Sequence, residues 1–169
     1  MPETPQQYTA RILATLGGQP PLEVLTATPA KLSSLVKGKS SAEIARKPAP
    51  GKWSVAEIIA HLADVEMVIG YRLRKILEAD GTPIQAYDQD VWAGFSKYDA
   101  IPLEESLHKQ TILRASNLRL LRSLKPEQWQ CYGMHAERGR ETVQRVAEMT
   151  AGHDLNHLAQ IEKIGRAHV

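Results

Sequence analysis

Several residue types that mark common protein classes are scarce in this sequence of 169 residues. It contains one cysteine and one phenylalanine, and aromatic residues make up only 5% of the chain. A single cysteine excludes an intramolecular disulfide framework and any metal cluster built from several thiolates. Segments in which β-branched and polar residues alternate are nearly absent, which argues against a fold dominated by β-strands.

The sequence also lacks a strong charge imbalance and long apolar runs. The formal net charge is +2 and the signs are interspersed, so there is no basic patch of the kind that nucleic-acid binding needs. No apolar run approaches the length of a membrane span, and the N-terminal residues MPETP lack a signal-peptide pattern. We therefore expect a cytoplasmic protein that binds neither nucleic acid nor membranes.

The residues that are abundant favour helices. Leucine, alanine, glutamate, arginine and lysine dominate, and hydrophobic residues make up 43% of the chain, an ordinary value for a globular protein. A chain of this length is long enough to bury a core as one unit. We expect a single all-α domain over residues 1–169, with no β-sheet beyond a short turn pairing.

Capping residues, glycines and prolines predict where the helices begin and end. Two N-terminal helices are expected near residues 4–16 and 20–36, and we interpret them as one interrupted arm. A capping box of Ser54 and Glu57 begins a helix that continues to about residue 79. Two more helices are expected near 102–124 and 142–165, after a long irregular connection over 80–101. This order predicts an antiparallel four-helix bundle of the up-and-down type.

Two histidines interrupt the apolar face of the last predicted helix. His153 and His157 are four residues apart and therefore lie one above the other on one face. The burial of two imidazoles costs free energy unless both have partners, and a metal ion is a partner that uses two at this spacing. Ordinary hydrogen bonds at a helix edge are the alternative interpretation.

A third histidine, His61, lies on the apolar face of the helix near 54–79, close to its start. If this helix and the last one are antiparallel, the start of one lies beside the end of the other, and the three rings converge. Three imidazoles leave one or two coordination positions for water or substrate, as in a catalytic metal site. We expect His108 to lie at the surface and His168 in the tail. His135 lies in a turn and could reach the mouth of the site, but a surface role is the favoured interpretation.

Several polar residues are candidates for the surroundings of this site. Asp64 and Asp154 could accept hydrogen bonds from metal-bound imidazoles, although a surface charge or a helix-end role would also explain them. Glu66 and Arg72 interrupt an apolar segment, and they could pair with each other near a cavity. Arg114 belongs to a polar row on the 102–124 helix that either lines the centre of the bundle or faces solvent.

The aromatic residues gather in and near the connection over 80–101. A connection this long is often functional in a compact domain, and we interpret it as a lid or a wall of the site, with Trp92 in the pocket. The alternative is a surface loop whose aromatic side chains fill gaps between helix ends.

Two segments of the chain resemble the DinB/YfiT-like superfamily. These are residues 53–66 (WSVAEIIAHLADVE) and 153–161 (HDLNHLAQI), and the resemblance extends over most of the chain. It implies a four-helix bundle, often dimeric, in which His61, His153 and His157 bind one divalent metal ion. Zinc and nickel are the metals associated with such sites.

The same resemblance implies a metal-dependent enzyme, either a hydrolase or a thiol S-transferase that uses a low-molecular-weight thiol such as bacillithiol or mycothiol. These reactions share a need for a Lewis acid that activates a thiol or a water molecule. The sequence shows no general base at a fixed spacing from the three histidines, and it does not identify the small-molecule substrate. The alternative is a metal-binding bundle without catalytic activity that acts as an interaction module.

Overall fold

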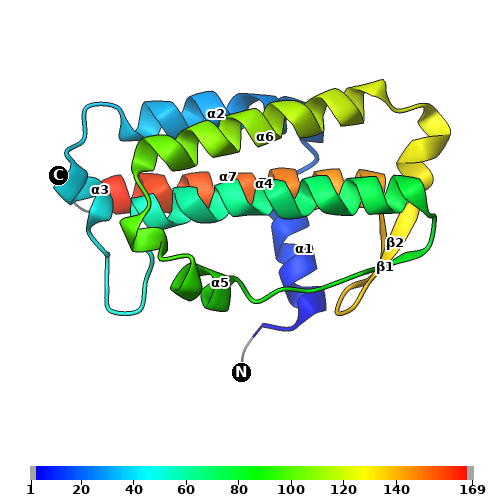
Figure 1. The fold of residues 1–169 in the computed structure, drawn as a ribbon, viewed down its shortest axis with the longest axis horizontal. Coiled ribbons are helices and arrows are strands. Elements are labelled where there is room, and N and C mark those ends of the chain that lie inside the picture. The colour runs from blue at the N-terminus through cyan, green and yellow to red at the C-terminus, as the bar shows by residue number, and fades with distance from the viewer. Residues whose placement is uncertain (1–2, 167–169) are drawn as a thin grey trace.

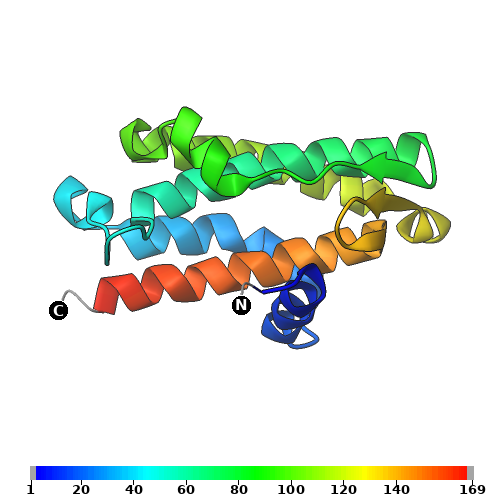
Figure 2. The same ribbon diagram turned by 90° about the horizontal axis from the view of Figure 1, so that it is seen from below.

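The computed structural model describes residues 3–166. Four helices lie side by side: α2 (Pro21–Val36), α4 (Val55–Glu78), α6 (Leu103–Ser123) and α7 (Val143–Arg166) (Figures 1 and 2). The predicted four-helix bundle is therefore confirmed. The predicted capping box is also present, because the Ser54 side chain accepts a hydrogen bond from the Glu57 N–H and the Glu57 carboxylate accepts one from the Ser54 N–H.

The directions of the helices differ from a simple up-and-down order. Helices α4 and α6 are neighbours that run the same way, and so are α2 and α7, whereas α4 and α7 are antiparallel (Figure 1). The segment between α4 and α6, residues 79–102, causes this arrangement, because it returns along the bundle before α6 begins. It is called the returning segment below. A long irregular connection was expected here, but its length alone did not indicate that it returns to the starting end of α4.

The N-terminal helix α1 (Pro5–Leu16) is not an arm of the bundle. It lies across α7 instead of continuing the line of α2, and Gly17 ends it in a left-handed conformation (φ 60°) (Figure 1). The interpretation of α1 and α2 as one interrupted arm is therefore wrong. The connection after α2 contains a short helix, α3 (Ser41–Ala45), with its own capping box.

A small sheet lies at the end of the bundle where α7 begins. Strands β2 (Tyr132–His135) and β3 (Gly139–Thr142) form an antiparallel hairpin, which is the turn pairing that was expected. Strand β1 (Thr82–Ile84) adds a third, parallel strand, which was not expected. Its three residues are too few for a recognisable alternation. The returning segment continues through α5 (Gln89–Phe95) and the short helix Tyr98–Ala100, while a second short helix, Pro126–Gln130, follows α6.

The bundle has two apolar clusters and a polar layer between them. One cluster includes Leu25, Leu73 and Val146, and the other includes Leu32, Ile58 and Ile161. Between them on α4 lie buried polar side chains, among them Asp64 and Glu66. No helix in the described residues is long and apolar enough to span a membrane.

Gly152 sets the close approach of α1 to α7, directly before His153. A Cβ atom added here would overlap the Ile12 carbonyl oxygen, which is backbone and cannot rotate away. We expect Gly152→Ala to destabilise the protein by about 1–3 kcal/mol through overpacking. Urea unfolding monitored by circular dichroism measures the change.

Gly165→Ala is the matched control on the same helix. The nearest atom to its added Cβ is the Lys39 Nζ at 3.6 Å, the flexible end of a side chain. This control should leave stability unchanged or raise it slightly, because alanine favours helix more than glycine does. A Gly152→Ala protein as stable as the wild type would contradict the close approach described here.

Candidate metal centre

Three imidazole rings meet between α4 and α7. They belong to His61, His153 and His157, which are called the triad below. The Nε2 atom of His153 lies 3.2 Å from the Nε2 atom of His61 and 3.1 Å from that of His157. The antiparallel pairing of the two helices brings the early part of α4 beside the later part of α7, as the sequence predicted. His61 is buried (1% exposed), and the other two rings are partly buried.

The three nitrogens have the spacing and charge state that a divalent ion requires. Tetrahedral zinc with bonds of 2.0–2.1 Å to imidazole separates its ligand nitrogens by about 3.3 Å, close to the distances found here. Burial lowers the pKa of His61 to about 3, with a further contribution from His157, and burial also lowers the pKa values of His153 and His157. The rings are therefore neutral near pH 7, as metal ligation needs.

The opposite nitrogens of the three rings differ in their contacts. His157 Nδ1 lies 2.9 Å from the Gln160 side-chain oxygen, the type of contact that orients a metal-bound imidazole. Gln160 was not predicted, although its position three residues after His157 on one helix was visible in the sequence. The Nδ1 atoms of His61 and His153 are buried and have no hydrogen-bond partner among the described residues.

Asp64 and Asp154 do not contact the imidazoles, so their predicted role as hydrogen-bond partners of the three rings is wrong. Asp64 is buried, and it accepts hydrogen bonds from the Tyr98 hydroxyl at 2.7 Å and from the Lys109 ammonium. Asp154 is also fully buried and binds Arg114. Neither carboxylate is a surface charge.

Arg114 on α6 contacts the three other helices of the bundle, and its Nη1 atom donates a hydrogen bond to the Leu25 carbonyl oxygen on α2 at 2.9 Å. Its guanidinium donates two hydrogen bonds to Asp154 on α7, at 2.6 and 3.1 Å, and one to Glu66 on α4 at 2.6 Å. Asn117 donates a further hydrogen bond to the Glu66 carboxylate. Of the two alternatives that the sequence left open for Arg114, the structure has the one in which it lies at the centre of the bundle. The suggested pair of Glu66 and Arg72 does not form, because Arg114 is the partner of Glu66.

The aromatic side chain that packs on the triad is Trp53, not Trp92. The Trp53 and His61 ring centroids are 5.0 Å apart. Trp92 instead packs against Tyr87 and Phe95 and lines a separate groove beside Arg72. The returning segment nevertheless contributes a wall to the site region through Tyr87 and Gln89.

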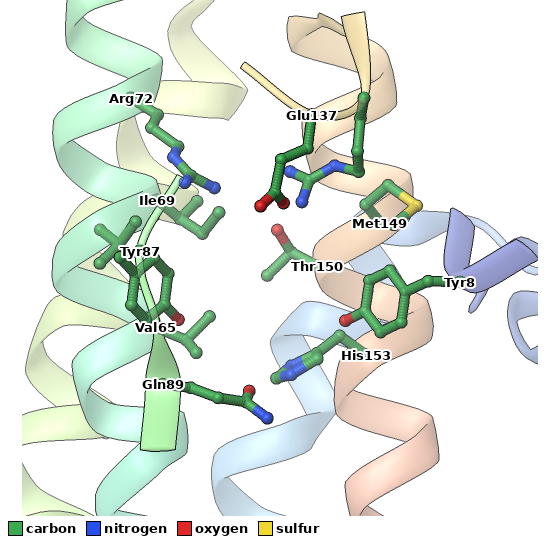
Figure 3. A pocket seen from close by; sticks show the side chains of 12 residues that line it. Tyr8, Val65, Ile69, Arg72, Tyr87, Gln89, Glu137, Met149, Thr150 and His153 are labelled. Atoms are coloured by element: carbon green, nitrogen blue, oxygen red, sulfur yellow. The ribbon is translucent and has the colours of Figure 1, made fainter. Parts of the chain in front are cut away.

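A cavity of about 260 Å³ opens beside the triad (Figure 3). His153 belongs to the triad and also lines the cavity, so the two are continuous. The other lining residues come from α1, α4, the returning segment, the β2–β3 turn and α7; they are Tyr8, Val65, Val68, Ile69, Arg72, Tyr87, Gln89, Glu137, Arg138, Met149 and Thr150.

The remaining histidines are placed as follows. His108 is exposed on α6, as expected. His135 is 3% exposed, so the expectation of a surface role is wrong. Its Nδ1 atom accepts hydrogen bonds from the backbone N–H groups of Glu137 and Arg138 and holds the β2–β3 turn. Burial lowers its pKa to about 4. His168 lies outside the described residues.

Comparisons with known proteins agree with this architecture. A family model described as the DinB superfamily matches residues 25–161. A protein of Oceanobacillus iheyensis named "Putative metal-dependent hydrolase" is 32% identical over 114 residues, which are 68% of this chain and 66% of that protein. "Putative metal-dependent hydrolase YfiT" of Bacillus subtilis is 25% identical over 146 residues, which are 86% of this chain and 82% of YfiT.

The solved structure of Bacillus subtilis YfiT has a similar fold. It superposes with a TM-score of 0.82 at 24% sequence identity and covers 87% of this chain and 85% of its own. That structure is described as a probable metal-dependent hydrolase with an unusual four-helix bundle topology.

Proposed function

The chain belongs to the DinB superfamily, and on this premise we propose that it is an enzyme dependent on a divalent metal ion bound by His61, His153 and His157. One observation carries the proposal: the side chain at the centre of the triad, His153, also lines a cavity. A metal ion bound there would be open to a small molecule, as in catalytic sites, and not enclosed as in structural ones. The names of the relatives support metal dependence.

Bound by the triad, a divalent ion supplies Lewis acidity, which lowers the pKa of a water molecule or a thiol and makes it a nucleophile. The protein holds the three imidazoles neutral through burial, and Gln160 fixes the orientation of His157. Trp53 packs against the ring of His61. Glu137 is the only carboxylate among the residues that line the cavity, which makes it the candidate proton acceptor.

Two reactions follow from this arrangement. Hydrolysis is favoured by the names of the relatives. Transfer of a low-molecular-weight thiol is favoured by a specific observation: the polar contacts of the three rings within the described residues include no carboxylate. A metal-activated thiol needs a general base less than water does, because the thiol is the stronger acid. Zinc and nickel are the proposed ions.

We expect turnover that requires the metal. The experiment incubates zinc- or nickel-loaded protein with p-nitrophenyl esters, and separately with bacillithiol, mycothiol or cysteine together with an aromatic chloride. Activity in one arm should disappear on chelation and return on metal addition, while circular dichroism of the chelated protein still shows a folded bundle. Unfolding on chelation would identify a structural ion and support the non-catalytic binding module instead.

We also propose that the protein forms a homodimer in the cytoplasm. Exposed apolar side chains on α4 and α5 support self-association, namely Met67, Tyr71, Val91 and Phe95. Sedimentation equilibrium at low micromolar concentration distinguishes a dimer from a monomer.

A further inference from the structure

The two buried arginines of the bundle differ in their partners. Arg114 is 2% exposed and contacts two carboxylates, whereas Arg72 is 7% exposed and forms no ion pair within the described residues. Arg72 donates one hydrogen bond, from Nη2 to the Gln85 carbonyl oxygen at 2.7 Å. A buried charge is costly unless it is paired, so Arg72 lacks the counter-charge that its environment demands.

The guanidinium group of Arg72 points into the cavity beside the triad (Figure 3). The rings of Tyr8 and Tyr87 reach the same cavity from opposite sides, and neither hydroxyl has a hydrogen-bond partner among the described residues. Burial raises the pKa of Tyr87 to about 12 and also raises the pKa of Tyr8, so both hydroxyls remain protonated donors. These groups offer N–H and O–H donors to a ligand.

The second guanidinium at the cavity is already paired. Arg138 binds Glu141 through two hydrogen bonds, at 2.7 and 3.0 Å. Glu137 also lines the cavity, and its carboxylate points into the same space as the Arg72 guanidinium (Figure 3). It is exposed and forms no ion pair within the described residues. Arg72 is therefore the buried cation at the cavity that has no ion-pair partner within the described residues, and Glu137 is a more exposed negative charge at the same cavity. This suits a singly charged carboxylate better than a phosphate dianion, and the planar guanidinium matches the geometry of a carboxylate.

The part of α4 between Arg72 and the triad indicates the length and polarity of a ligand. His61, Val65, Ile69 and Arg72 follow spacings of four, four and three residues, which place them on one face of α4. The Cα atoms of His61 and Arg72 are eleven residues apart, a rise of about 16 Å along the helix axis, and the Arg72 side chain shortens this span because it extends into the cavity toward His153 (Figure 3). Val65 and Ile69 form an apolar wall between these two ends. At about 260 Å³ the cavity is slightly smaller than typical drug-sized ligand sites.

We propose that this cavity binds a small molecule with a carboxylate at one end, held by Arg72, an apolar middle, and the reacting group at the His61–His153–His157 end. The assignment of the reacting end rests on the proposed function. The assignment of the carboxylate end does not, because it follows from the unpaired charge of Arg72.

The test compares acids with their uncharged amides by isothermal titration calorimetry. The zinc-loaded full-length protein is titrated with 6-mercaptohexanoate and with 6-mercaptohexanamide, and the metal-free protein with hexanoate and hexanamide. A charge-assisted hydrogen bond predicts that each acid binds about tenfold to a hundredfold more tightly than its amide. In Arg72→Gln this ratio should fall to near one, with the metal content unchanged.

Two further variants keep the test independent of any folding defect in Arg72→Gln. Arg74→Gln removes an exposed arginine of the same helix that faces α6, and it should retain the full preference for the acid. Glu137→Gln removes the like charge at the cavity and should strengthen binding of the acid but not of the amide.

An equal affinity for acid and amide in the wild type, or a preference that persists in Arg72→Gln, would overturn the inference. Tighter binding of hexyl phosphate than of hexanoate would overturn the choice of a carboxylate. A protein that binds no metal but still prefers hexanoate to hexanamide through Arg72 would refute the proposed function and support the carboxylate site.

Discussion

Replacement of Arg114 by methionine is expected to lower the free energy of unfolding by about 3–5 kcal/mol, because it leaves two buried carboxylates without a counter-charge. Glu66 and Asp154 are each 1% exposed or less, and both contact the Arg114 guanidinium at 2.6 Å. Burial already raises the pKa of Glu66 against the opposing effect of Arg114. Without the guanidinium, these carboxylates must take up protons or admit water into the core.

Urea unfolding at pH 7 measures this loss. Arg119→Met, an exposed arginine on the same helix, is the control and should change stability by less than about 0.5 kcal/mol. The triple variant with Glu66→Gln, Asp154→Asn and Arg114→Met removes all three charges together. It should recover a large part of the loss, because the cost arises from unpaired charge and not from lost volume. An Arg114→Met protein of wild-type stability would show that the carboxylates do not depend on this arginine.

Replacement of His153 by alanine is expected to abolish stabilisation by metal. His153 is the shared member of the triad, because its Nε2 atom lies within 3.2 Å of both other Nε2 atoms. A ligand that binds only the folded state stabilises it by about 2.7 kcal/mol at a concentration one hundred times its dissociation constant. For a chain of this size, this corresponds to a rise of about 5–11 °C in melting temperature.

Thermal melts of metal-free protein, with and without added zinc or nickel, test this prediction. The wild type should show the full rise, and His153→Ala should show none. His108→Ala removes an exposed histidine of α6 and should behave like the wild type. A rise of equal size in His153→Ala would show that the metal stabilises the protein from another site.

The parts of the structure that the sequence predicted depend on local or periodic signals. The capping box at Ser54 is local, and the convergence of His61 with His153 and His157 needed only helical spacing and an antiparallel pairing of two helices. The predicted antiparallel pairing of α4 and α7 is present, although the bundle as a whole does not have a simple up-and-down order. Helical spacing and this one pairing were therefore sufficient to predict that the three histidines converge.

The parts that the sequence did not predict depend on contacts between distant segments. Arg114 finds Glu66 and Asp154 across sequence separations of 48 and 40 residues, which no local pattern encodes. The strand β1 owes its place to pairing with β2, about fifty residues further along the chain.

Helix geometry alone excludes two of the incorrect predictions, the Glu66–Arg72 pair and the contact of Asp154 with the imidazoles. Glu66 and Arg72 are six residues apart, so they project from different faces of α4 and cannot pair directly. Asp154 follows His153 immediately and is therefore rotated by about 100° around the axis of α7, away from the triad and toward Arg114. Adjacent residues on a helix do not face each other.

The most direct test of the central claim is the metal content of untagged protein, measured by elemental analysis after exhaustive buffer exchange. We predict about one divalent ion per chain in the wild type and in His108→Ala, and almost none in His61→Ala, His153→Ala or His157→Ala. Stoichiometric metal in the His61→Ala and His153→Ala proteins, or an equal loss in His108→Ala, would contradict the assignment of the three histidines as ligands.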